Sequence, residues 1–271
     1  MEINMEGYRP YCQMGTTCET RPIREKRIVW TKIESEPFWD GRFQVKTLRR
    51  EFIASAAEMW RSSYPEIYGS PHQFILDPDQ YEGLMALEEA WESDSKTKVY
   101  CMPVVVVELE TKRVVSATML TKYERNLQVE ISFAGTHPDY RIRGITDELR
   151  RVTRKIAMAS GAEYLTTFCE TWHDITQNWC IKGGWKIAGI FPGNFTRWNG
   201  GTQEYRGCAV QFYQFVGDGE KYATKPEEWH LAPEAGEVWE VLKKVNRKIE
   251  RRFKRIKKNR DSVLFLTSRN D

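Results

Sequence analysis

A short basic loop lies in the middle of the chain, directly before a segment with helical periodicity. Arg141 and Arg143 are separated by one residue, and Gly144 follows. The first backbone N–H groups of a helix have no partner inside the helix and lie at the positive end of its dipole. Because Gly144 has no β-carbon, the backbone there can approach a phosphate closely, and the arginines add charge-assisted hydrogen bonds. The loop therefore predicts an anion site, although a glycine among arginines also occurs in ordinary surface turns.

The residues on either side of this loop predict the elements that hold it. Residues 127–134 alternate between apolar and polar types, which is typical of a strand. After the loop, apolar residues recur at helical spacing over about residues 146–160, and Gly161 ends the pattern. This stripe consists of Leu149, Val152, Ile156 and Ala159.

The rest of the chain predicts further strands and helices around this unit. Thr47 is a candidate N-cap for a helix that ends near residues 62–65, with an apolar stripe of Leu48, Phe52, Ala56 and Met59. Other helices are expected around residues 80–92, 174–182 and 237–259. Strands are expected at residues 42–46, 102–108, 113–120, 162–169, 185–191 and 208–215. A strand meander followed by alternating strands and helices predicts a mixed α/β sheet.

The stretch around the basic loop resembles the central motif of the GNAT superfamily of acetyl-CoA-dependent N-acetyltransferases. In that family a strand runs through a V-x-P-x-Y-R corner into an R/Q-x-x-G-x-G/A loop and its helix. The matching residues are Thr136, Pro138, Tyr140, Arg141 and Gly144. Downstream, residues 173–185 resemble the family's next helix, which ends in G-F before the sixth strand. The resemblance covers about residues 42–216 in element order, and residue-level matching is confined to about residues 128–191.

The resemblance implies a fold and a place for acetyl-CoA. The fold class is expected to be α/β (α+β), a GNAT-like, mixed, mostly antiparallel twisted sheet flanked by helices. The pantetheine arm is expected to pair like an extra strand with the backbone of Phe133, Ala134, Gly135 and Thr136. The pyrophosphate is expected on the amides of Ile142, Arg143, Gly144, Ile145 and Thr146, next to Arg141, with His173 as a further contact.

Two residues of the loop depart from the family's pattern. Thr146 stands where the family prefers glycine or alanine, so its hydroxyl either donates to a phosphate or its bulk loosens the loop. Asp147 places a carboxylate in the first turn of the helix, where it competes with a bound anion.

The reaction that the resemblance implies requires a base, because an alkylammonium group has a pKa near ~10.4 and only the neutral amine attacks a thioester. Glu130 is the candidate base, since some family members carry their general-base glutamate at this position of the strand. Alternation places Val129, Ile131 and Phe133 on one face, and Glu130 and Ser132 on the other. The alternative is that Glu130 faces water or pairs with a lysine.

A proton donor for the leaving thiolate is harder to assign. Many family members place a tyrosine four or five residues before the G-F glycine, and here these positions hold Cys180 and Trp179. A thiol titrates near ~8.5, so Cys180 is the candidate donor. Cysteines in helices more often pack as small core residues. His137, beside Pro138, is expected to be structural.

The acceptor in this superfamily usually binds between the segment after the first strand and the connection between the last two strands. Here these are about residues 64–80 and 192–207. The second contains Phe195, Trp198, Glu204 and Tyr205. Aromatic rings and a carboxylate are suited to a cationic amine, although a glycine-rich loop often carries aromatic residues without such a role.

The charge of the chain is uneven. The formal net charge is +3, yet residues 243–260 hold eleven Lys and Arg and a single acid, Glu250. The remainder holds 30 basic and 37 acidic residues, which favours a cationic acceptor such as a polyamine, a lysine-like metabolite or an aminoglycoside. The basic segment also carries an apolar stripe. Its helix is therefore expected to dock on the body or on a second subunit, or else to contact nucleic acid or an anionic membrane surface.

The remaining composition bounds the class of protein. Six scattered cysteines form no Cys-x-x-Cys pair, so reduced thiols are expected and no metal site is. No apolar run approaches the ~20 residues of a membrane span, and the start lacks the features of a secretory signal, so a cytoplasmic protein is expected. The expected organisation is an N-terminal extension (1–35), an acyltransferase domain (36–217), and a C-terminal extension with a basic amphipathic helix (218–271).

The sequence thus predicts an enzyme that moves an acetyl group from acetyl-CoA to a primary amine of a small cationic metabolite, by direct attack with the help of a general base. Two alternatives keep the fold. One is an acyltransferase or binding protein that associates with nucleic acid or protein through the basic helix. The other is a catalytically inactive CoA-binding scaffold. The acceptor, the acyl chain length and the oligomeric state stay open.

Overall fold

The chain forms a seven-stranded sheet in the computed structural model, which describes residues 17–93, 95–141 and 144–267. The strand order is β1-β2-β3-β4-β5-β7-β6, and every neighbouring pair is antiparallel except β4 and β5. The strands are β1 (Phe43–Thr47), β2 (Cys101–Glu108), β3 (Arg113–Tyr123), β4 (Gln128–Thr136), β5 (Tyr164–Glu170), β6 (Lys186–Trp198) and β7 (Glu204–Phe215). The predicted mixed, mostly antiparallel sheet is confirmed.

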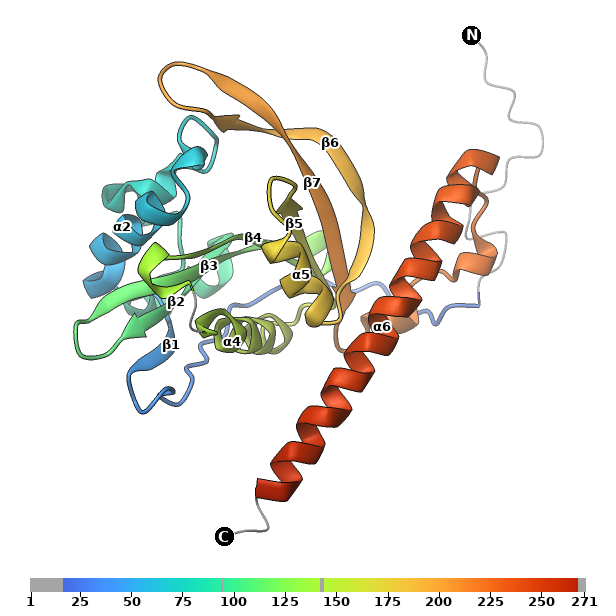
Figure 1. Ribbon diagram of the computed structural model, residues 1–271, viewed down its shortest axis with the longest axis horizontal. Helices are drawn as coiled ribbons and strands as arrows, with labels where there is room; N and C mark the ends of the chain where they lie inside the picture. The colour runs from blue at the N-terminus through green and yellow to red at the C-terminus, as the bar shows by residue number, and fades with distance from the viewer. Residues whose placement is uncertain (1–16, 94, 142–143, 268–271) are drawn as a thin grey trace.

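Helices cover both faces of this sheet (Figure 1). α2 (Ile53–Ser63) packs on one face of β3 and β4, and α4 (Ile145–Ala159) packs on the other face. α5 (Ile175–Lys182) follows β5, and α6 (Pro233–Thr267) lies against the edge strand β6. The short helical segments are α3 (Ser95–Lys98) and the 3-10 turns Arg50–Phe52, Pro65–Ile67, Gln73–Leu76, Pro78–Gln80, Glu88–Ser93, Glu124–Asn126, Pro138–Tyr140, Gly219–Tyr222 and Pro226–Glu228.

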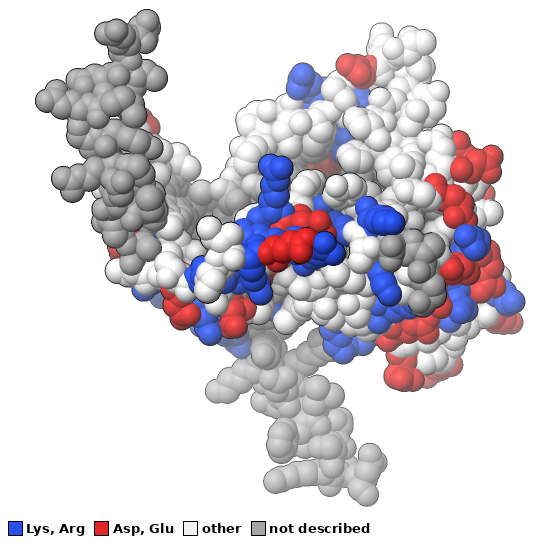
Figure 2. Space-filling view, turned by 180° about the vertical axis from the view of Figure 1, so that it is seen from behind, with Lys and Arg blue, Asp and Glu red and all other residues white. Residues whose placement is uncertain are grey.

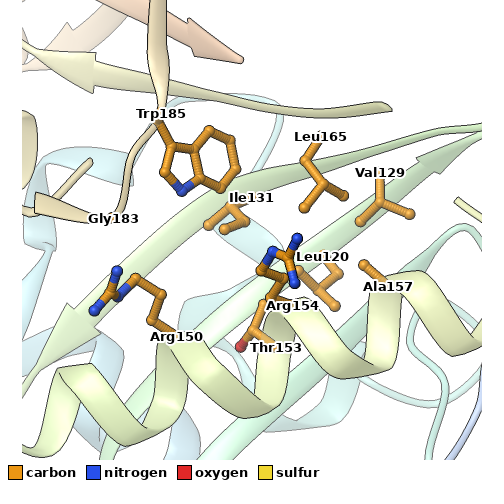
Figure 3. A pocket seen from close by; sticks show the side chains of 10 residues that line it. All are labelled: Leu120, Val129, Ile131, Arg150, Thr153, Arg154, Ala157, Leu165, Gly183 and Trp185. Atoms are coloured by element: carbon orange, nitrogen blue, oxygen red, sulfur yellow. The ribbon is translucent and has the colours of Figure 1, made fainter. Parts of the chain in front are cut away.

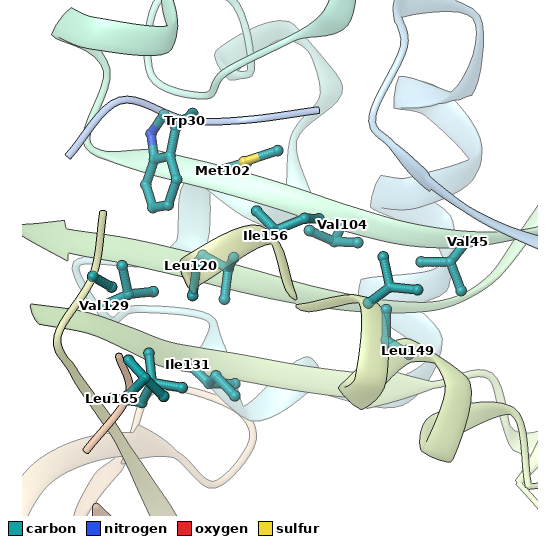
Figure 4. Packing of buried hydrophobic residues seen from close by; sticks show 14 of the residues in the cluster. Trp30, Val45, Met102, Val104, Leu120, Val129, Ile131, Leu149, Ile156 and Leu165 are labelled. Carbon is teal, nitrogen blue, oxygen red and sulfur yellow. The ribbon is translucent and has the colours of Figure 1, made fainter. Parts of the chain in front are cut away.

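The core under α4 largely follows the predicted stripe. Leu149, Val152 and Ile156 are buried and belong to one apolar cluster with the strands (Figure 4). Ala159, the fourth predicted member, is exposed. Ala157 and Ser160 take the buried positions at this end of the helix, and Gly161, with a φ of +94°, ends it before β5.

The core under α2 also confirms a predicted stripe, but not the predicted helix start. Phe52, Ala56 and Met59 are buried in a cluster with residues of β2, β3 and β4. Thr47, the expected N-cap, lies inside β1 and is fully buried. A 3-10 turn precedes the helix, which begins only at Ile53, so the expected cap is wrong.

Two further expectations are corrected by the structure. Residues 80–92 form no continuous helix, because Gly83 has a φ of +77° and Met85 pairs with Cys101. The last two strands are longer than expected. β6 runs to Trp198 and β7 starts at Glu204, so the expected loop over residues 192–207 is mostly strand, with a turn at residues 199–203.

The described part of the N-terminal extension packs on the domain. Ile28 and Trp30 are buried in the α4-side core. The buried ammonium group of Lys122 donates to the carbonyl oxygen of Ile28 over 2.8 Å, and Arg21 forms two 2.6 Å hydrogen bonds to Glu163. Residues 17–35 are therefore an integral part of the fold rather than a free arm.

α6 docks on the edge of the sheet through its middle. The side-chain amide of Asn246 accepts from the backbone N–H of Ile187 over 2.8 Å and donates to the carbonyl oxygen of the same residue over 2.9 Å. Ile249 is buried beside this contact, whereas Val238 and Val241 near the start of the helix are 60% and 63% exposed. The expected docking of the basic helix on the body is thus seen for its central turns.

Lys and Arg side chains are mixed with Asp and Glu over the face opposite to that of Figure 1, and no surface of one sign dominates it (Figure 2). Within the described ranges, no helix is long and apolar enough to cross a membrane. The same residues contain no group of three or more His, Cys, Asp or Glu side chains that is arranged to hold a metal ion.

Candidate active site

The parallel strands β4 and β5 part halfway along their length. Residues 128–131 pair with residues 164–167, and the described chain shows no pairing of these strands beyond that point. β4 nevertheless runs on to Thr136 and β5 to Glu170, each still paired on its outer side with β3 or β7. At the last paired position the hydroxyl of Thr167 donates to the carbonyl oxygen of Ile131 over 2.8 Å. We call the region between residues 132–136 and 168–170 the wedge. Its two unpaired strand edges are suited to an extended ligand that forms backbone hydrogen bonds.

The expected cofactor-binding residues of β4 all lie along this wedge. Ala134 is exposed, and Phe133 and Thr136 are buried. Gly135 lies so close to α2 that a β-carbon there would be 2.9 Å from the ring of Trp60. The close packing of α2 on Gly135 therefore fixes the strand whose edge borders the wedge.

A β-bulge at Ser132 changes which residues of β4 share a face. The register between β3 and β4 slips by one residue at this point. Val129 and Ile131 pack in the core under α4, whereas Phe133 packs in the core under α2. The prediction that these three residues share a face is therefore wrong, because the extra residue reverses the alternation. The bulge lies where the wedge begins.

The predicted anion loop ends in a left-handed glycine at the start of α4. Gly144 has a φ of +65° and is the N-cap of the helix, which begins at Ile145. Ile145 is buried and anchors the first turn, while Thr146 is exposed. No side chain caps the helix at Gly144, and the N–H of Asp147 donates to the carbonyl oxygen of Gly144 over 3.0 Å, so the amides of Ile145 and Thr146 are the candidates to bind an anion. The expected contacts Ile142 and Arg143 lie outside the described residues.

The corner between β4 and this loop is held by partly buried polar contacts. The hydroxyl of Tyr140 donates to Glu108 over 3.0 Å, and the guanidinium of Arg113 lies 2.9 Å from the ring of His137. The Nε of Arg141 donates over 3.2 Å to the carbonyl oxygen of Thr136 at the end of β4. His137 therefore has the structural role expected for it, and Arg141 folds back onto the end of the wedge.

Asp147, the acidic residue of the first turn, points to a partner on its own helix. Its carboxylate lies 3.2 Å from the guanidinium of Arg150 and is largely exposed. This ion pair partly offsets the repulsion that the carboxylate exerts on an anion at the helix N-terminus.

Glu130 is half-buried on the α2 side of β4, one residue before the strands part. Its carboxylate accepts from the hydroxyl of Ser132 over 3.2 Å, and Ser132 in turn lies 2.7 Å from the hydroxyl of Thr121. Burial raises the pKa of Glu130, and the hydrogen bond from Ser132 offsets part of this effect. In the described chain this carboxylate forms no ion pair, so the alternative of a lysine pair is not seen. A carboxylate with a raised pKa beside the point where two strands part has the properties of a general base.

The structure also brings together three residues that sequence reasoning missed. Tyr64 at the end of α2, Glu170 at the end of β5 and Arg197 in β6 form a buried cluster. The Nε of Arg197 donates to Glu170 over 2.8 Å, and the hydroxyl of Tyr64 donates to the same carboxylate oxygen. The ring of Tyr64 lies 6.0 Å from that of Phe133, so the cluster borders the wedge on its α2 side. No local pattern announces it, because its members are up to 133 residues apart in the chain.

One oxygen of this cluster is left without a partner. Glu170 is 7% exposed, and within the described residues its Oε2 has no hydrogen-bond partner. The same holds for Oε2 of Glu66, in the turn after α2. Burial raises the pKa of Glu170, offset in part by Tyr64 and Arg197, and the negative charge of Glu66 raises it further. A buried polar atom without a partner costs about 1–3 kcal/mol, so both oxygens favour a ligand that donates hydrogen bonds.

Two expected site residues differ in exposure: Cys180 is buried and His173 is exposed. Cys180 is fully buried in α5, with its sulfur 3.5 Å from that of Cys169, and burial raises the pKa of its thiol well above the usual value. This packing argues against the proton-donor role, because the thiol has no path to a leaving group. His173 is exposed just before α5, and its carbonyl oxygen accepts from Gln177 over 3.1 Å.

A small cavity of about 30 Å³ lies between α4 and the paired part of β4 and β5. Arg150 and Arg154 reach from α4 toward Trp185 along its wall (Figure 3). Its other walls are mostly apolar, including Ile131 and Leu165. Such a volume holds about one or two water molecules, so this cavity is not a substrate site.

The fold is similar to that of solved acetyltransferase structures. Ribosomal-protein-S5-alanine acetyltransferase from Vibrio fischeri superposes with a TM-score of 0.53 at 11% identity, over 68% of this chain and 96% of that chain. IAA acetyltransferase from Bacillus cereus gives a TM-score of 0.45 at 13% identity, over 64% of this chain and 99% of that chain. PaiA N-acetyltransferase from Thermoplasma acidophilum, solved in complex with coenzyme A, gives a TM-score of 0.43 at 14% identity, over 64% of this chain and 99% of that chain.

No family model matches the sequence, and no curated protein does. The structural likeness nevertheless defines the class of fold. The chain has the GNAT acetyltransferase fold, as the resemblance around residues 128–191 implied.

Proposed function

We propose that this protein is an N-acetyltransferase that transfers an acetyl group from acetyl-CoA to a primary amine. The observation that carries the proposal is the wedge, where β4 and β5 part after Ile131 and Thr167 while both strands continue. A helix N-terminus with a left-handed glycine, Gly144, follows the same strand β4. Together they offer strand edges for an amide-containing arm and backbone N–H groups for a phosphate.

Acetyl-CoA fits these features as the acyl donor. Its pantetheine arm is proposed to pair with the free edge of residues 133–136. Its pyrophosphate is proposed to lie on the amides of residues 142–146, of which Gly144 to Thr146 are in the described part. Arg141 supports this placement, because its guanidinium already lies beside the end of β4. His173, exposed near the start of α5, is retained as a proposed contact of the cofactor.

Glu130 is proposed as the general base. An ammonium group of the acceptor gives one proton to this carboxylate, directly or through a water molecule. The neutral nitrogen then attacks the thioester carbon, a C–N bond forms, and the C–S bond breaks as the tetrahedral intermediate collapses. The backbone N–H groups at the β-bulge are proposed to stabilise the oxyanion of this intermediate. As the intermediate collapses, the nitrogen gives its second proton to water, so the products are the acetylated amine and the thiolate of CoA.

The leaving thiolate is proposed to take its proton from water. Cys180 is enclosed in the core, and the hydroxyl of Tyr64 is engaged with Glu170. A thiol titrates near ~8.5, so the thiolate is a good leaving group that needs little help at neutral pH. A mechanism without a protein acid is therefore consistent with the chemistry.

The acceptor is proposed to be a small cationic amine that binds on the α2 side of the wedge. The carboxylates of Glu66 and Glu170 support a cationic acceptor, since both have an unpartnered buried oxygen. The rings of Tyr68 and Trp198, 5.3 Å apart, bring the segment after α2 against the end of β6. These are parts of the two segments from which the resemblance implied an acceptor site.

The direct test is an assay of free thiol release from acetyl-CoA with a panel of primary amines, paired with the melting temperature at saturating CoA. We expect CoA to raise the melting temperature and at least one cationic amine to release thiol. Stabilisation by CoA without release by any amine would instead indicate a CoA-binding scaffold. No stabilisation at any CoA concentration would overturn the proposal.

A further inference from the structure

Two carboxylates on the α2 side of the wedge each have a buried oxygen without a hydrogen-bond partner in the described residues. Glu66 and Glu170, which we call the carboxylate pair, come from the turn after α2 and from the end of β5. Each has one oxygen that solvent does not reach and that has no hydrogen-bond partner in the part of the chain that the structure describes. The turn that carries Glu66 packs on β6, whose Arg197 contacts Glu170, and the charge of Glu66 also raises the pKa of Glu170.

The charged groups around this pair leave one negative charge uncompensated. Arg197 contributes a single positive charge, and its Nη2 lies 2.6 Å from Glu170. His72 adds none at neutral pH, because burial and the neighbouring Arg197 both lower its pKa. With both carboxylates ionised, two negative charges therefore face one positive charge. An ammonium group supplies the missing charge together with three hydrogen-bond donors.

Two tyrosines, Tyr64 and Tyr205, lie near the carboxylate pair. Tyr64 donates to Glu170, and Tyr205 lies near enough that both carboxylates raise its pKa, after the larger effect of its burial. Tyr205 also lies 6.3 Å, between ring centroids, from Trp172. The hydroxyls and ring faces of such residues are well suited to a methylene chain that ends in a cation.

The pair is too far along the sheet to bind the amine that reacts. The thioester is proposed to lie where β4 and β5 part, next to Thr167, and Glu170 is three residues further along β5. At about 3.3 Å per residue this separation is about 10 Å. A cation at the carboxylate pair is therefore a second group of the acceptor, remote from the nitrogen that is acetylated.

We propose that Glu66 and Glu170 bind this second cationic group, so that the acceptor is a linear diamine or an amine with a cation of similar reach. The inference rests on the proposed function and specifies the substrate class of the same site. Arg197 and Tyr64 are positioning residues, because they contact Oε1 of Glu170 and leave Oε2 without a partner in the described part of the chain.

The test compares α,ω-diamines from diaminopropane to diaminooctane with n-alkylamines of the same chain lengths. The full chain is used at saturating acetyl-CoA, and kcat and KM are measured by thiol release. We expect the longer diamines to exceed the matched monoamines in kcat/KM by about tenfold or more, since one charge-assisted contact separates them. Glu66→Gln is expected to reduce this diamine-to-monoamine ratio by about tenfold, through KM rather than kcat.

Glu58→Gln is the matched control. Glu58 lies on α2, near Glu66 in the chain. Its side chain is 62% exposed and forms an ion pair with Arg61 over 3.9 Å. Its loss is expected to leave the ratio unchanged. Glu66→Gln is preferred to Glu170→Gln as the main variant, because removal of Glu170 leaves the buried Arg197 uncompensated and endangers the fold. A diamine-to-monoamine ratio near one in the unaltered protein, or a ratio that Glu66→Gln does not change, overturns the inference.

Calorimetry separates this inference from the proposed function. Diaminohexane and diaminooctane are titrated into the protein with CoA bound, where no acetyl group is present to react. Binding that Glu66→Gln weakens about tenfold supports the carboxylate pair even if no amine is ever acetylated. Acetylation of monoamines and diamines at equal efficiency, with no effect of Glu66→Gln on binding, supports the transferase and refutes the pair.

Discussion

Glu130 lies at the point where β4 and β5 part, and its role makes the most direct prediction at the scale of single residues. Glu130→Gln keeps the shape of the side chain and removes the base, so we expect kcat to fall by about 10²–10⁴-fold. The Kd of CoA is expected to stay the same. Glu110→Gln, at an exposed position after β2, is the control. An unchanged kcat would remove Glu130 from the base role.

The raised pKa of Glu130 also makes the stability of the protein depend on pH. Burial raises the pKa of Glu130 above its ordinary value of 4.5, so the folded protein holds this proton more tightly than the unfolded chain. The protein is therefore expected to lose this contribution to stability as the pH rises through the raised pKa. Glu130→Gln should have the higher melting temperature at pH 7, and the difference should vanish below pH 4.5. A difference in melting temperature between the two proteins that does not change with pH over this range would contradict the burial argument.

The residue scale is also where the sequence was least informative. Alternation along residues 129–133 misplaced Phe133, because a β-bulge is a property of two paired strands rather than of one. The cluster of Tyr64, Glu170 and Arg197 had no signal at all, since three elements bring it together. Cys180 was chosen by its position in a motif, whereas its contact with Cys169 depends on how α5 packs on β5.

At the scale of elements, the prediction concerns the two glycines with positive φ that lie at the ends of the helix α4. Gly144 has a φ of +65° and Gly161 a φ of +94°, so alanine at either position is expected to cost about 1–2 kcal/mol of unfolding free energy. Only Gly144→Ala changes the loop that is proposed to hold the pyrophosphate. We expect it to weaken CoA binding about tenfold in calorimetry, whereas Gly161→Ala leaves the Kd unchanged. Equal effects of both variants on CoA would show that the loop has no special role.

Elements with strong periodicity were predicted well. The strands from β1 to β5 and the helices α4 and α5 were placed to within a few residues. α4 buries one continuous stripe on the sheet, and β2 and β3 are continuous buried runs. The segment at residues 80–92 failed, since its acidic and apolar residues fit a helix while Gly83 turns the backbone away. The ends of β6 and β7 failed for another reason. Glycines and polar residues there suggested a loop, yet pairing between the two strands keeps them extended.

At the scale of the whole molecule, the prediction concerns how α6 is attached to the edge of the sheet. Asn246→Ala removes both hydrogen bonds to the backbone of Ile187, which is expected to cost about 1–3 kcal/mol of unfolding free energy. Amide exchange at Ile187 should become faster, as measured by hydrogen exchange. Lys248→Ala, on an exposed face of the same helix, should leave both quantities unchanged. Protection at Ile187 that survives Asn246→Ala would mean that other contacts hold the helix.

The place of α6 has a practical consequence for anyone who shortens this chain. β6 is an outermost strand of thirteen residues, and the amide of Asn246 satisfies part of its otherwise open margin. A truncation before residue 246 would expose a ladder of unsatisfied groups to other copies, and such margins promote aggregation. The basic helix, which resembles a dispensable tail, is therefore expected to limit aggregation. The ring of Phe253 lies against Gly184 at the end of α5, so deletions should remove only residues beyond Phe253.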